Sequence, residues 1–171
     1  MIFGRVRQTL QALFAWTRAV DDDLAASYLG PELFALFQTM SRSDRQHHLR
    51  VLRHLLGQER DHPSLMVAAL LHDVGKTRVR FTIPERMMAV AVEKVIPPMF
   101  ERWSRGEARG WRRGFVVSAK HPEWGADMVA AAGGDALAVK LILYHQSQVS
   151  DIPDDEIKMW LPYLQMADNA S

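Results

Sequence analysis

The segment PSLMVAALLHDVGK, residues 63–76, decides the predicted fold. Proline is favoured in the first turn of a helix, where Pro63 stands, and the residues that follow it form a continuous apolar run. A helix that is apolar on all sides must be buried on all sides, so we expect this helix at the centre of the molecule. Gly75 ends the run, because glycine readily stops a helix.

Apolar residues recur at helical spacing on both sides of this segment, without a convincing strand pattern, an internal repeat or a change of composition. Ser43 and Gln46 fit a capping box at one helix start, and Pro122 is predicted to open another helix. The pattern predicts a single all-α domain over residues 1–171. Its helices are expected over 3–19, 43–58, 135–146 and 154–168, with others opened by Pro31, Pro63, Pro84 and Pro122.

The composition is that of a soluble globular protein, with 48% hydrophobic and 24% charged residues. A formal net charge of +1 favours neither a long nucleic acid nor a membrane as partner. No apolar run is long enough to span a bilayer, and we expect a cytoplasmic protein. For the apolar residues 13–16, packing on the domain is preferred to an amphipathic helix that lies on a membrane surface.

A histidine and an aspartate, His72 and Asp73, stand together at the end of the apolar central helix. Burying an imidazole beside an ionised carboxylate is costly unless a cation or a hydrogen-bond partner compensates. Helix bundles build metal centres from such side chains near helix ends. Further candidates near helix ends are His47, His121, His145 and Asp168. The chain has no cysteine, so any metal must bind nitrogen and oxygen atoms.

These residues occur in the order H…HD…H…H…D, and the sequence around them resembles the HD superfamily of metal-dependent phosphohydrolases. HHLRV, residues 47–51, resembles the opening helix of the family, and ALLHDVGK, residues 69–76, resembles its doublet helix. HPEWGADMVAAAGG, residues 121–134, and LILYH, residues 141–145, resemble the segments that add two histidines in dinuclear members. The resemblance covers about residues 40–168 and implies a helical bundle with a metal cleft between helices, on which the helices of 1–39 would pack.

The resemblance also implies a centre of one or two divalent ions. Its ligands would be His47, His72, Asp73, His121, His145 and Asp168. Asp73 would bridge the ions and act in catalysis, and Lys76 would place its positive charge near a phosphoryl oxygen. Iron or manganese suits these ligands best, with magnesium, nickel and zinc as alternatives.

Such an enzyme would cleave a nucleotide or another small phosphate ester with a metal-activated hydroxide. Two alternatives stay open: an HD-type di-iron oxygenase, which has the same ligands, and a metal-binding regulatory protein without catalysis. The segment HQSQVSDIPDDE, residues 145–156, lacks the GYP motif of the subgroup that cleaves a cyclic dinucleotide. That reaction is therefore not expected.

The first ligand has two adjacent candidates, His47 and His48. Helical periodicity places His48 nearest the centre of the apolar stripe that includes Val51. The family's opening helix instead has its ligand four residues before the valine, which selects His47 and leaves His48 as a packing or supporting residue. The arginine-rich segment 101–113 is interpreted as a solvated basic loop, with contact to the substrate as the alternative.

Overall fold

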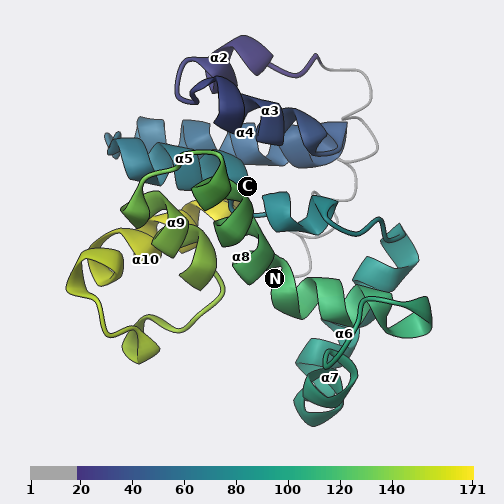
Figure 1. Ribbon diagram of the computed structural model, residues 1–171. Helices are drawn as coiled ribbons and strands as arrows, with labels where there is room; N and C mark the ends of the chain where they lie inside the picture. Colours follow the sequence, from purple (N-terminus) through teal and green to yellow (C-terminus); the bar gives the residue numbers. More distant parts are fainter. Residues whose placement is uncertain (1–18) are drawn as a thin grey trace.

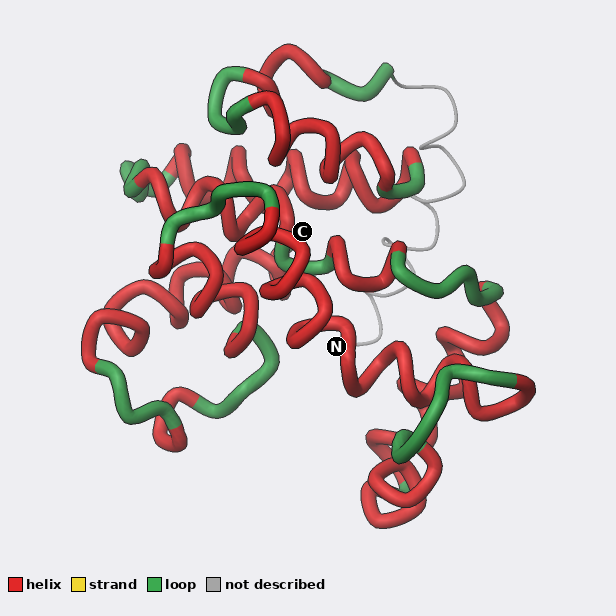
Figure 2. Tube along the Cα trace, viewed as in Figure 1, coloured by secondary structure: helices red, strands yellow, loops and turns green. Residues whose placement is uncertain are grey.

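The computed structural model describes residues 19–171, and every regular element in that range is a helix (Figure 1, Figure 2). The α-helices are α2 (Asp22–Ala26), α3 (Pro31–Thr39), α4 (Arg42–Gly57), α5 (Pro63–Leu71), α6 (Ile83–Val95), α7 (Pro97–Trp103), α8 (Arg113–Ala131), α9 (Ala136–Tyr144) and α10 (Asp155–Ala170). Short 3-10 helices are η2 (Val74–Thr77), η3 (Gly110–Arg112) and η4 (Val149–Asp151). The all-α prediction is confirmed, whereas the predicted helix over 3–19 falls almost wholly outside the described residues.

Helix α5 is the central helix that the apolar run predicts. Its residues from Ser64 to Leu71 are all buried, and α4, α9 and α10 pack around it. Figure 1 shows α4 and α5 side by side, with α9 below them. Apolar residues of α2 and α3, including Ala25 and Phe37, join the same core. Because His72 and Asp73 directly follow α5, this packing fixes their positions in the interior.

Helix α4 begins with a different cap from the predicted one. Its N-cap is Ser41, whose Oγ accepts a hydrogen bond from the backbone N–H of Asp44 and donates one to the Asp44 carboxylate. The proposed Ser43–Gln46 capping box is therefore wrong. A serine with a polar residue three positions later also occurs two positions earlier, as Ser41 and Asp44, and this pair caps the helix.

Helix α8 contradicts the prediction that a helix starts at Pro122. The helix runs from Arg113 to Ala131, and Pro122 lies buried inside it. Proline has no N–H to donate to the carbonyl four residues earlier, which here is that of Ser118. The ring of His121 replaces the missing donor, with Nδ1 2.8 Å from the Ser118 oxygen. The His121 side chain therefore offsets part of the cost of the buried proline.

Helices α6 and α7 form an arm that extends from α8 (Figure 1). In the predicted basic loop, Trp103 packs edge to face against Trp111, and Arg112 donates to the Trp103 carbonyl. Part of the basic segment thus stabilises the arm through a hydrogen bond to its backbone. Within residues 19–171, no helix is both long and apolar enough to cross a membrane.

Candidate metal centre

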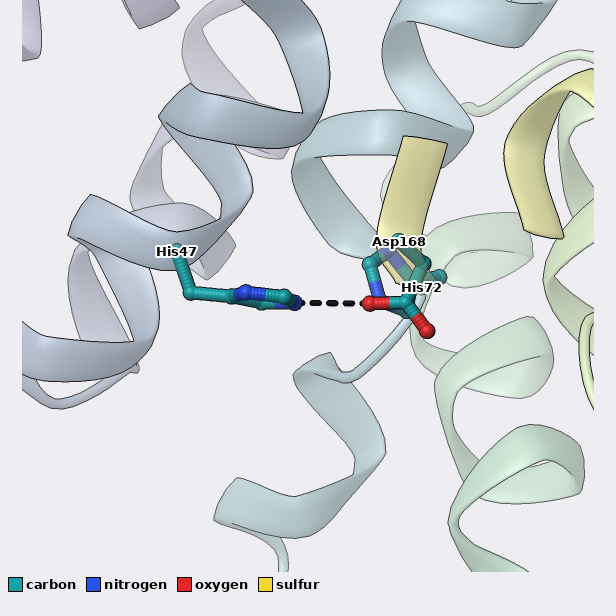
Figure 3. A group of neighbouring side chains, drawn as sticks. All are labelled: His47, His72 and Asp168. Atoms are coloured by element: carbon teal, nitrogen blue, oxygen red, sulfur yellow. Dashed lines mark hydrogen bonds and ion pairs between the residues drawn. The ribbon is translucent and has the colours of Figure 1, made fainter. Parts of the chain in front are cut away.

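Three side chains from separate parts of the fold meet beside the end of α5, and we call them the outer group: His47 of α4, His72 and Asp168 of α10. His47 Nε2 lies 2.8 Å from Asp168 Oδ1, and His72 Nε2 lies 3.6 Å from the same oxygen. Figure 3 shows the His47 ring pointing at the Asp168 carboxylate, with His72 behind it. The longer distance is beyond a hydrogen bond but within the range of electrostatic attraction.

A second set, which we call the inner group, consists of Asp73, His121 of α8 and His145 directly after α9. His121 Nε2 lies 3.1 Å from Asp73 Oδ1 and 3.2 Å from His145 Nε2. His145 Nε2 lies 3.6 Å from the same Asp73 oxygen. In each group the candidate ligand atoms all lie within 4.8 Å of one another. The fold thus gathers all the residues that the resemblance implies as ligands into two neighbouring groups.

Gly75 allows the turn after the doublet to approach α8. A Cβ on Gly75 would lie 2.1 Å from the His121 carbonyl oxygen and 2.6 Å from the Gly125 nitrogen, both backbone atoms that cannot move aside. Only glycine fits this contact, so the residue predicted as a helix stop also determines how closely Asp73 approaches His121.

The HD domain family model matches residues 45–166, which is more than half of the chain. The chain belongs to the HD domain family. Comparison with curated proteins and with solved structures gave no match. Membership supports a metal-dependent function of the hydrolase type and the binding of divalent metals, in agreement with the histidine and aspartate groups.

In this HD domain, the backbone fixes the ring orientations of the inner histidines. His121 Nδ1 lies 2.8 Å from the Ser118 carbonyl, and His145 Nδ1 lies 2.7 Å from the Ile142 carbonyl, one of those left free at the end of α9. A carbonyl oxygen only accepts, so each Nδ1 carries a proton, and in the neutral form of either ring the lone pair is at Nε2. Two lone pairs and the Asp73 oxygen then face one another, an arrangement that repels itself unless a cation lies among them. The donor set therefore fits a divalent metal.

The protonation states also suit a metal. Burial alone would raise the pKa of Asp73, but the Lys76 ammonium and the surrounding histidines together outweigh burial and hold the pKa well below its usual range. Burial opposes ionisation of Asp168 too, and the hydrogen bond from His47 keeps its pKa low. Burial lowers the pKa of His121 to about 4. At neutral pH both carboxylates are charged and His121 is neutral, as metal ligands must be.

His72 differs from the inner histidines. Its ring is buried, and neither ring nitrogen has a hydrogen-bond partner. Burial alone would lower the pKa of His72, but the carboxylates of Asp168 and Asp73 outweigh burial and raise it. An imidazole with two unpartnered nitrogens in the interior is costly, and a metal ion at Nε2 would supply one partner.

Lys76 contacts the centre directly. Its Nζ is 2.5 Å from Asp73 Oδ2, the carboxylate oxygen that does not face His121. The guanidinium of Arg78 instead lies over the Trp124 ring, 5.3 Å from its centroid. Lys76 is thus placed to act at the inner group.

His48, predicted as a packing or supporting residue, is fully buried. Its Nε2 has no hydrogen-bond partner, and the ring belongs to a third group of potential ligands with His72 and Asp73. The periodicity of α4 was the signal in the sequence that directed His48 inward. The remaining histidines lie outside these groups: His54 pairs with Gln58, and His62 is the N-cap of α5.

Proposed function

We propose that this HD domain is a metal-dependent phosphohydrolase that acts on a nucleotide or another small phosphate ester. The observation that carries the proposal is the inner group. Its two Nε2 atoms and the Asp73 oxygen converge at 3.1 to 3.6 Å, while both Nδ1 atoms are committed to backbone carbonyls. Such a set of lone pairs is suited to a divalent cation.

The outer group would hold one ion and the inner group a second. Asp73 would contact both ions, because its carboxylate also lies within 4.8 Å of a candidate ligand atom of His72. When bound, the ions would supply Lewis-acid chemistry, lowering the pKa of water and polarising the phosphate. Iron or manganese is preferred for imidazole and carboxylate ligands without thiolate, with zinc, magnesium and nickel as alternatives.

Lys76 would bind the phosphate. Its ammonium contacts Asp73 on the oxygen opposite to the histidines. A cation at Asp73 would satisfy the carboxylate and leave the lysine donors for a phosphoryl oxygen. Lys76 would then orient the substrate and stabilise the negative charge that builds up on it.

A di-iron oxygenase is the second candidate function, since nitrogen and oxygen ligands of this kind also suit iron. Lys76 favours hydrolysis, because oxygen activation does not require a phosphate-binding cation beside the metals. A regulatory protein with a silent centre is a third alternative, and the complete set of candidate ligands argues against it.

The test begins with metal analysis of protein purified without chelator. The metal-loaded protein is then assayed without oxygen, in manganese, against a panel of phosphomonoesters and phosphodiesters. We expect release of phosphate or opening of a phosphodiester. Turnover that requires iron and oxygen, and leaves every phosphoester bond intact, would establish the oxygenase instead. Metal binding without turnover of any panel member would favour the regulatory alternative.

A further inference from the structure

His48 is a fully buried histidine that the proposed centre does not use. It lies on α4, fully buried, next to His47 and among the apolar residues Val51 and Leu52. Its ring centroid is 4.5 Å from that of His72 and 5.2 Å from that of His47. The ring therefore lies against the outer group, not in a separate part of the core.

A hydrogen bond within α4 determines which nitrogen of His48 faces the centre. Nδ1 lies 2.6 Å from the Asp44 carbonyl oxygen. Because a carbonyl only accepts, Nδ1 carries the proton, and the neutral ring presents its lone pair at Nε2. Nε2 is buried and has no hydrogen-bond partner.

The backbone that holds the ring is itself anchored. The Asp44 carboxylate accepts hydrogen bonds from Ser41 Oγ at 2.8 Å and from Arg86 Nη1 of α6 at 3.2 Å. The first turn of α4 is thus tied to its own cap and to a second helix. The direction of the His48 ring is consequently set by the fold.

The same arrangement holds the inner histidines. In His48, His121 and His145, Nδ1 donates to a backbone carbonyl three or four residues earlier, which leaves Nε2 as the ring nitrogen available to a ligand group. Metal-bound histidines are typically oriented in this way, because the second hydrogen bond fixes the tautomer. His48 shares this arrangement, and its Nε2 is left without a partner.

Packing alone does not explain this residue. An apolar side chain of similar size would fill the space without burying an unsatisfied nitrogen, which typically costs about 1–3 kcal/mol. The candidate ligand atoms of His48, His72 and Asp73 lie within 4.8 Å of one another, close enough to share one ion.

We propose that His48 is itself a metal ligand, through Nε2, to the ion that His72 binds. This inference rests on the proposed metal centre and adds one ligand to the six that the family pattern implies.

The test compares His48→Leu with two controls on the same helix. Leu52→Ala removes buried contacts but no donor atom, and His54→Leu removes an imidazole that lies outside the ligand groups. Manganese affinity is measured by calorimetry, and the fold by thermal unfolding in chelator. We expect His48→Leu to weaken manganese binding about tenfold or more while it melts in chelator no earlier than the wild type. Leu52→Ala should melt earlier and keep its manganese affinity.

Wild-type affinity in His48→Leu would overturn the assignment. If that variant does not fold, nitrogen-15 NMR of histidine-labelled wild-type protein, titrated with zinc, decides the question. A coordination shift at His48 Nε2 supports the inference, and an unshifted His48 Nε2 beside a shifted His145 Nε2 overturns it. Wild-type protein that binds neither manganese nor zinc would instead overturn the proposed metal centre itself.

Discussion

The outer and inner groups use the same two residue types, but they differ in exposure. In the outer group the side chains of Asp168 and His47 are 39% and 25% exposed. In the inner group those of His121 and His145 are 1% and 5% exposed, and that of Asp73 is 17%. The side chains of His47 and Asp168 are therefore the part of the centre that solvent reaches most easily.

The two groups also differ in how their rings are held. The inner histidines are tied to backbone carbonyls, whereas His72 has no hydrogen-bond partner at either ring nitrogen and His47 is paired through Nε2 with Asp168. The fold thus fixes the ring orientations of the inner histidines through the backbone, whereas the ring nitrogens of His72 lack such a hydrogen bond. Burial and backbone hydrogen bonds decide this difference, because the residue types are the same.

The largest effect on metal content and activity is expected from Asp73→Asn, because Asp73 lies where the two groups meet. A neutral amide cannot bridge two cations, so most bound metal and all activity should be lost. Metal analysis and the phosphoester assay measure this, with Asp127→Asn at an exposed position of α8 as the control. Full activity in Asp73→Asn would contradict the metal-hydrolase function.

Gly75→Ala should disturb the inner group through the backbone. The new Cβ meets the His121 carbonyl oxygen at 2.1 Å, so η2 and α8 must separate. We expect the free energy of unfolding to fall by about 3 kcal/mol, together with loss of the inner ion. Denaturant unfolding and metal analysis measure both effects. Gly57→Ala is the matched control, because its Cβ meets nothing within 4 Å, and an equal loss there would contradict the explanation.

Asp168→Asn should affect metal binding at the outer group and leave the inner group intact. The outer group loses its only carboxylate, whereas the inner group keeps Asp73 and its backbone-held histidines. Bound metal should fall to about one ion per chain, with activity strongly reduced. Retention of both ions would show that the outer group does not depend on Asp168, and loss of both would show that the inner group is not independently formed.

The pH dependence of metal binding should differ between the groups. A metal must displace the proton from an imidazole, and the pKa of His72 is raised above its ordinary value of 6.5 by Asp168 and Asp73, against the effect of burial. Burial lowers the pKa of His121 to about 4. Acidification from about pH 8 to about pH 6 should therefore weaken the outer ion first. Manganese titrations at the two pH values measure this, and prior loss of the inner ion would contradict it.

The smallest effect on metal content is expected from Lys76→Met. Removing a positive charge beside Asp73 should leave metal affinity unchanged or raise it, since the ammonium repels a bound cation. Phosphate binding should weaken, with KM rising about tenfold for the loss of one charged hydrogen bond. Steady-state kinetics and a metal titration measure the two effects. Arg80→Ala, an exposed basic position, is the control.

The amino-acid sequence alone determined the fold class and the candidate residues. Apolar periodicity predicts the helices, and the continuous run before His72 and Asp73 predicts the buried helix that carries them. These features are local, because a helix is formed by hydrogen bonds between residues close in the chain. The local pattern gave a wrong prediction at Pro122, where a residue typical of helix starts lies inside a helix. Pro122 looks like a helix start, yet α8 continues through it, and His121 bonds the carbonyl that the proline leaves without a donor.

The tertiary structure decided which nitrogen of each ring faces the centre and how close the groups come. Whether His48 turns toward the ligands depends on the Asp44 carbonyl and on Arg86 of another helix. Whether Asp73 reaches His121 depends on the contact of Gly75 with α8. Distances between residues far apart in the chain follow from helix packing, which residue order does not specify. The sequence therefore named the candidate ligands, and only the packed helices divided them into a buried group held by the backbone and a more exposed one.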